Sequence, residues 1–142
     1  MKESKGSAEW YGSLKEGNGM VSTGSGSLMD SPYSFAKRFG DEQGTTPEEL
    51  IAAAHASCFS MALSGQLGER GMTAERIETT ATVTLGKTDS GFGVTSSHLD
   101  VQVKILGADQ AKFDEAAQAA KTGCPISKLL NTEITMTARL ES

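Results

Sequence analysis

One helix with a well-marked start constrains this chain more than any other feature of its sequence. Thr46, Pro47 and Glu49 form a T-x-x-E pattern with proline at the first helical position, which is the signature of a capped helix start. The apolar run AAAHASCFSMAL follows directly, and glycines recur after it. The pattern therefore predicts a central helix that begins at Pro47 and ends between Ser64 and Leu67.

Beyond this helix, apolar residues alternate with polar ones, as they do in β-strands. Residues 76–87 and 93–106 flank the turn-rich TDSGFG, so we expect a long hairpin there. The other expected elements are three short strands in the first 35 residues, a polar loop over 37–46, a helix over 109–121, a short helix that begins at Pro125, and a strand over 133–141.

Strands and helices are mixed without a regular βαβ rhythm, so the expected fold class is α+β. The 142 residues are enough to bury one core, and neither a repeat nor a linker divides them. We therefore expect a single domain over residues 1–142.

Charge and composition exclude several classes of partner. The net charge is −5 without a basic stripe, which argues against nucleic acid or an anionic membrane as the main partner. The N-terminus has no apolar signal region, and no stretch reads as long enough to span a bilayer. We expect a cytoplasmic protein, and in that compartment a cysteine pair is more often catalytic or redox-sensing than structural.

The chain offers no recognisable metal or nucleotide motif. Its two cysteines and two histidines, His55 and His98, are too far apart in sequence for a zinc finger or ribbon. Neither a G-x-G-x-x-G turn nor a Walker loop is present.

Cys58 lies in the middle of the predicted helix and has two interpretations. A free cysteine often serves as a small buried apolar residue. The alanines around Cys58 have small side chains, however, so another element can approach the thiol closely. His55 is one turn before Cys58 and is either a base or, more simply, a hydrogen-bonded helix histidine.

Cys124 lies between Gly123 and Pro125, at the expected N-cap of the short helix. Unpaired N–H groups and the helix dipole favour a thiolate at such a position. Cys58 and Cys124 are 66 residues apart, so they are not a C-x-x-C dithiol. Either the fold brings them together as a redox pair, or they never meet.

A buried thiolate needs a cation, because burial alone raises the pKa of a thiol. Arg38 lies just ahead of the central helix, and Glu48 in its first turn is free to hold the guanidinium in a bidentate pair. The alternative for Arg38 is an exposed loop charge.

The length of the helix limits how these groups can combine. Ten residues separate Glu48 from Cys58, roughly 15 Å along a continuous helix. A carboxylate at that distance cannot serve the sulfur of its own helix. We therefore expect a two-fold dimer in which Arg38 and Glu48 of one subunit serve Cys58 of the other.

Several stretches together resemble the OsmC branch of the OsmC/Ohr family of thiol-dependent peroxidases. They are AEWYGSLKEGNG, VSTGSG, SPYSFAKRF, GTTPEELIAAAHASCFSMAL and KTGCPISKLLN, and they cover nearly the whole chain. The cysteine-bearing helix combined with GCP-x-S is the most specific part. In the Ohr branch the arginine comes much nearer the N-terminus, and this chain has no arginine before Arg38.

The resemblance implies an intertwined homodimer with a curved antiparallel sheet and central helices. It implies reduction of hydroperoxides, preferably organic ones, in defence against oxidative or osmotic stress. Cys58 would correspond to the peroxidatic thiol that becomes a sulfenic acid, and Cys124 to the resolving thiol that forms a disulfide with it. Arg38 would activate the thiolate and Glu48 would orient Arg38. No haem, metal or flavin is implied, and the reductant would be an external dithiol, often a lipoyl group.

Two other functions stay open on the residues alone. One is an apolar-ligand binder, or a sensor of oxidants and electrophiles, with regulatory cysteines. The other is a structural dimer in which Cys58 only fills the core.

Overall fold

The central helix begins where the sequence predicts, in a computed structural model that describes all residues 1–142. Helix α2 spans Pro47–Glu69, and the hydroxyl of Thr46 accepts a hydrogen bond from the Glu49 N–H at 3.0 Å. The helix ends two residues beyond Leu67, the latest end that the sequence predicted, and Leu67 itself is fully buried. Tertiary packing there outweighs the poor helix propensity of the glycines on either side.

The chain divides into two compact units, Met1–Leu50 and Ile51–Ser142. Their boundary falls inside α2, after its first turn. The expectation of a single domain over 1–142 therefore stays a prediction.

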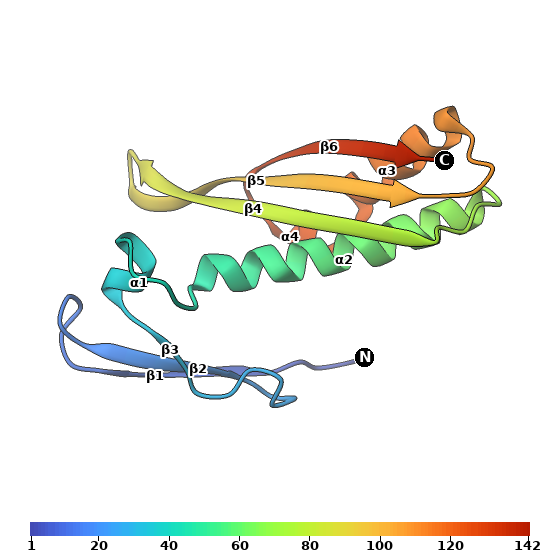
Figure 1. The fold of residues 1–142 in the computed structure, drawn as a ribbon. Coiled ribbons are helices and arrows are strands. Elements are labelled where there is room, and N and C mark those ends of the chain that lie inside the picture. The colour runs from blue at the N-terminus through green and yellow to red at the C-terminus, as the bar shows by residue number, and fades with distance from the viewer. The chain divides into compact units, whose positions relative to one another are not determined.

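The first unit is a small antiparallel sheet followed by a short helix. Its elements are β1 (Gly6–Tyr11), β2 (Asn18–Thr23), β3 (Ser31–Tyr33) and α1 (Phe35–Phe39). The strands pair in the order β1-β2-β3, which confirms three short strands at the N-terminus (Figure 1). Helix α1 occupies part of the region expected to be strand and loop, because Ser34 caps it by accepting from the Lys37 N–H at 3.2 Å.

The second unit packs helices against a three-stranded sheet. Its remaining elements are β4 (Arg76–Thr88), β5 (Gly91–Lys104), α3 (Gln110–Gly123), α4 (Pro125–Leu129) and β6 (Glu133–Glu141). Strands β4 and β5 form the predicted hairpin. The mixture of sheets and helices confirms the α+β class.

One strand pairing differs from the expected antiparallel sheet. Strand β6 runs parallel to β5, with Ser96 opposite Glu133 and Lys104 opposite Glu141. The chain between these strands contains α3 and α4, and a connection of that length carries it back to the end of the sheet where β5 began. Apolar alternation predicts a strand but not its direction.

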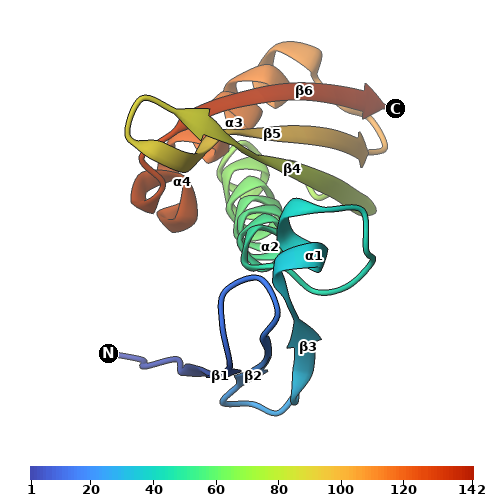
Figure 2. The same cartoon turned by 90° about the vertical axis from the view of Figure 1, so that its left-hand side faces the viewer.

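The core of the second unit lies on one face of this sheet. Alternate residues of β5, which the sequence placed on a common face, are buried and meet apolar side chains from α2 and α3. These residues are Leu99, Val101, Val103 and Ile105 from the sheet side, Phe59, Leu63 and Leu67 from α2, and Phe113, Ala116, Ala117 and Ala120 from α3. Figures 1 and 2 show α2 running along the sheet at this face.

By length and composition alone, α2 could cross a membrane, with 23 residues and a mean hydropathy of 1.3. By this measure the expectation that no stretch is long enough was wrong. The core helix of a soluble protein passes the same test. Of the apolar stretch of α2, 22% is buried in this structure, and Phe59, Leu63 and Leu67 are among its fully buried residues.

We predict that Phe113→Ala lowers the free energy of unfolding by about 3–5 kcal/mol, because it removes a fully buried ring and leaves a cavity. The neighbouring Lys112 is exposed, so Lys112→Ala should change this free energy by no more than about 0.5 kcal/mol. Chemical denaturation of both variants measures the difference. Equal losses would contradict the placement of the core.

Candidate active site

The second unit places Cys58 and Cys124 on two helices that meet at the core. Cys58 is half-buried on α2 and packs against the apolar cluster. Cys124 is fully buried and is the N-cap of α4, where its sulfur accepts from the Ser127 N–H at 3.4 Å. Pro125 is the first residue of that helix. The predicted N-cap position of Cys124 is confirmed.

The two thiols lie close enough for each to shift the pKa of the other, although 66 residues separate them in the sequence. Both are free thiols, and a hydrogen bond between the two side chains contributes to the pKa of each. The fold therefore brings the two cysteines together.

The surroundings shift the pKa values of the two thiols in opposite directions. Burial raises the pKa of Cys58, and the neighbouring Cys124 raises it further against an opposing hydrogen bond from the Ile126 N–H. Burial also raises the pKa of Cys124, but hydrogen bonds from the Ser127 side chain and N–H, from Cys58 and from Ile126 outweigh it and leave the pKa lowered. Cys58 is thus the thiol that needs a further cation to become a thiolate.

The first unit contains a preformed arginine–carboxylate pair. Arg38 on α1 donates from Nε and Nη2 to Glu48 Oε1 at 3.1 and 2.8 Å, and Nε also lies 3.3 Å from Oε2. Glu48 is buried, whereas the Arg38 side chain is 39% exposed. The guanidinium lies over the Phe39 ring, with Cζ 5.2 Å from the ring centroid. Arg38 is therefore held in place with part of its charge still accessible, rather than being a loose loop charge.

His55 is completely buried and fully hydrogen-bonded. Its Nδ1 lies 2.7 Å from Ser97 Oγ on β5, and its Nε2 lies 2.8 Å from Ser127 Oγ on α4. The interpretation as a hydrogen-bonded helix histidine is confirmed. Neither serine was predicted from the sequence, although Ser127 lies three residues after the N-cap Cys124, a spacing that brings the side chain back to the cap.

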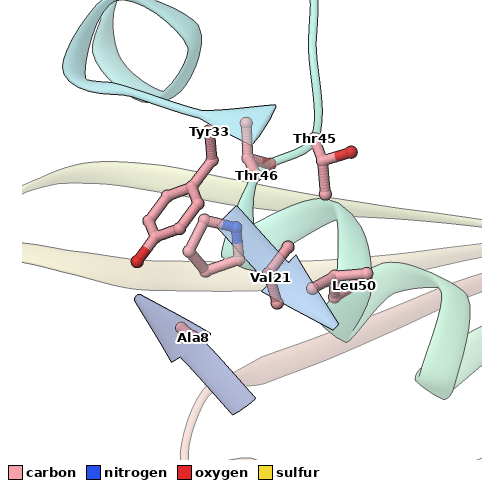
Figure 3. Close-up of a pocket in the computed structure, with 7 residues that line it drawn as sticks. Ala8, Val21, Tyr33, Thr45, Thr46 and Leu50 are labelled. Carbon is pink, nitrogen blue, oxygen red and sulfur yellow. The ribbon is translucent and has the colours of Figure 1, made fainter. Parts of the chain in front are cut away.

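An apolar pocket of about 130 Å³ lies within the first unit (Figure 3). Its labelled lining residues are Ala8, Val21, Tyr33, Thr45, Thr46 and Leu50. The pocket suits a hydrocarbon group better than a charged one. It contains no thiol, carboxylate or imidazole that could act as a nucleophile or base.

Comparison with known proteins places the chain in a family. The model of the OsmC-like proteins matches residues 40–139. The chain is also 53% identical over 138 residues to the peroxiredoxin OsmC of Escherichia coli, covering 97% of this chain and 96% of that protein. The chain belongs to the OsmC family.

More distant members of the family share its fold. The organic hydroperoxide resistance protein OhrB of Bacillus subtilis is 38% identical over 96 residues, about 66% of either chain. The crystal structure of OhrB matches this fold with a TM-score of 0.69, at 25% identity, over 96% of this chain and 98% of that one. An OsmC-like protein from Vibrio cholerae matches with a TM-score of 0.76 at 21% identity, over 97% of this chain and 99% of that one.

Burial of His55 predicts a loss of stability in acid. Its folded-state pKa is lowered from the ordinary 6.5 by burial, so below that pH the unfolded chain takes up a proton here that the folded protein does not. The contribution is complete above about pH 6.5 and is lost as the pH falls below it. Between about pH 7.5 and 5.5, the free energy of unfolding should fall more for the native chain than for His55→Gln. Equal slopes in chemical denaturation would contradict this prediction.

Proposed function

We propose that this protein is a cysteine-based peroxidase that reduces hydroperoxides, preferably organic ones, through Cys58 and Cys124. The observation that carries the proposal is the proximity of two free thiols, one on α2 and one at the start of α4, each of which shifts the pKa of the other. Membership of the OsmC family supports it, since its relatives are named as a peroxiredoxin and as organic hydroperoxide resistance proteins.

In the first step, the Cys58 thiolate attacks the outer oxygen of the hydroperoxide. The O–O bond breaks as an S–O bond forms, so Cys58 becomes a sulfenic acid and the alkoxide takes a proton and leaves as an alcohol. In the second step, the Cys124 thiolate attacks the Cys58 sulfur. The S–O bond breaks, the hydroxide leaves as water with one added proton, and a Cys58–Cys124 disulfide remains.

We assign activation of Cys58 to Arg38, with Glu48 orienting the guanidinium. The pair is preformed, and a guanidinium would stabilise both the Cys58 thiolate and the departing alkoxide. Helix α2 is continuous from Pro47 to Glu69, so the ten-residue separation argues against service to Cys58 of the same chain. We therefore assign the pair to Cys58 of a second subunit, in a homodimer with shared sites.

An external dithiol, such as a lipoyl group, would reduce the disulfide and complete the cycle. The proposed cycle uses no haem, flavin or metal. We place it in the cytoplasm, where a structural disulfide would be unusual and a catalytic one would not. Its role there would be defence against oxidative or osmotic stress.

We expect the native protein to consume an alkyl hydroperoxide continuously in a steady-state assay with dihydrolipoamide. Cys58→Ser should lower the rate by at least about a thousand-fold, because the nucleophile is lost. Cys124→Ser should react once and then stall as a sulfenic acid, which a dimedone-type reagent traps.

Stoichiometric oxidation of the native protein without turnover would favour the redox-sensor alternative. Binding of an apolar ligand without oxidation of either thiol would favour the binder. A normal rate in Cys58→Ser would leave Cys58 as a core residue.

Shared sites predict complementation between two inactive variants. A heterodimer of Cys58→Ser and Arg38→Ala subunits, purified with two different tags, holds one site with both Cys58 and Arg38 if the two residues come from different subunits. It should recover about half the native rate, whereas each homodimer stays inactive. If both residues come from one chain, the heterodimer is as inactive as its parents.

A further inference from the structure

Four buried side chains of the second unit form a continuous row that ends at a sulfur. Ser97 Oγ lies 2.7 Å from His55 Nδ1, and His55 Nε2 lies 2.8 Å from Ser127 Oγ. Ser127 in turn contacts the Cys124 sulfur, because its N–H donates to Sγ at 3.4 Å, and its hydroxyl helps to lower the pKa of that thiol. His55, Ser97 and Cys124 are fully buried and Ser127 is 7% exposed. The row joins β5, α2 and α4.

The hydroxyl of Ser127 carries one hydrogen but faces two partners, so its direction depends on His55. A neutral imidazole donates from one ring nitrogen and accepts at the other. If Nδ1 accepts from Ser97, then Nε2–H donates to Ser127, and the Ser127 hydrogen is free to point at the sulfur of Cys124. If Nδ1 donates to Ser97, Ser127 must donate to Nε2 and can only accept from the thiol. The first arrangement suits a Cys124 thiolate and the second a Cys124 thiol.

We propose that His55 is a positioning residue, which holds the Ser127 hydroxyl as a donor to the Cys124 sulfur and so prepares Cys124 to attack the oxidised Cys58. The row lets a neutral ring do this by a change of tautomer, without a buried charge. That suits His55, whose pKa burial lowers. The other titratable group that affects Cys124 is Cys58.

This proposal rests on the proposed function only for the reaction step in which Cys124 attacks the oxidised Cys58. In that step the Cys124 thiolate displaces hydroxide from the Cys58 sulfenic acid, and one proton converts the hydroxide to water. Without a donor from Ser127, the electron pair on the Cys124 sulfur loses one stabilising hydrogen bond, and less of the thiol is ionised at neutral pH. The Ser127 N–H contact at 3.4 Å would persist.

The reactivity of Cys124 can be tested without any peroxide. In a Cys58→Ser background, the rate of iodoacetamide alkylation and the ultraviolet absorbance of the thiolate are followed against pH. Ser127→Ala should raise the pKa of Cys124 and slow its alkylation near neutral pH about ten-fold, the scale of one hydrogen bond to a charged group.

Two amide substitutions at His55 separate positioning from packing. The glutamine amide reaches about as far as Nε2 and can still donate to Ser127, whereas the asparagine amide reaches about as far as Nδ1 and can contact only Ser97. His55→Asn should therefore slow alkylation like Ser127→Ala, and His55→Gln should restore most of the rate. His98→Asn is the matched control, because the His98 ring bonds Thr135 and Thr137 on β6 rather than Ser97 or Ser127, and it should leave Cys124 unchanged.

Equal alkylation by His55→Asn, His55→Gln and the parent, with folding confirmed by circular dichroism, would overturn the proposal and leave His55 as a packing residue. Equal slowing by both variants would also overturn it. In the cysteine-intact protein, one equivalent of alkyl hydroperoxide should give a Cys58 sulfenic acid that lasts about ten times longer in Ser127→Ala. If no sulfenic acid forms in any variant, the proposed function fails, while the alkylation result still decides the role of His55.

Discussion

The packing of one side of α2 against the sheet of the second unit determines the position and burial of the Cys58 thiol. Buried residues recur at every fourth position, His55, Phe59, Leu63 and Leu67, and this spacing fixes the rotation of the helix about its axis. Cys58 lies beside that stripe rather than in it, and is therefore half-buried. If α2 were rotated about its axis by one residue position, the Cys58 thiol would be either buried in the core or fully exposed to solvent, depending on the direction.

The same packing explains why the two thiols differ. Burial raises the pKa of both, but only Cys124 lies at a helix start where N–H and hydroxyl groups converge on its sulfur. The second unit thus supplies its own stabilisation for the Cys124 thiolate and leaves that of Cys58 incomplete. The group that we propose to complete it is Arg38, which is paired with buried Glu48 in the first unit.

The sequence correctly predicted structural features that depend on residues close together in the chain. The cap at Thr46, the hairpin and the N-cap position of Cys124 are all of this kind. Where a feature depends on residues that are distant in the sequence, its prediction was wrong or was not made. Apolar alternation carries no strand direction, so the parallel pairing of β6 was missed. The helix ends at Glu69, two to five residues beyond its predicted end, because tertiary packing outweighs the glycines that marked that end.

The row of hydrogen bonds through His55 was the least predictable part, because Ser97 lies 42 residues away and Ser127 lies 72 residues away. An apolar residue at position 55 could fill the same space, and the cost of burying polar groups makes that the simpler solution. A histidine with two required partners does something that packing alone does not. It fixes α4 relative to α2 and β5 through directional bonds. Because α4 carries Cys124 and α2 carries Cys58, those bonds also fix the approach of one sulfur to the other.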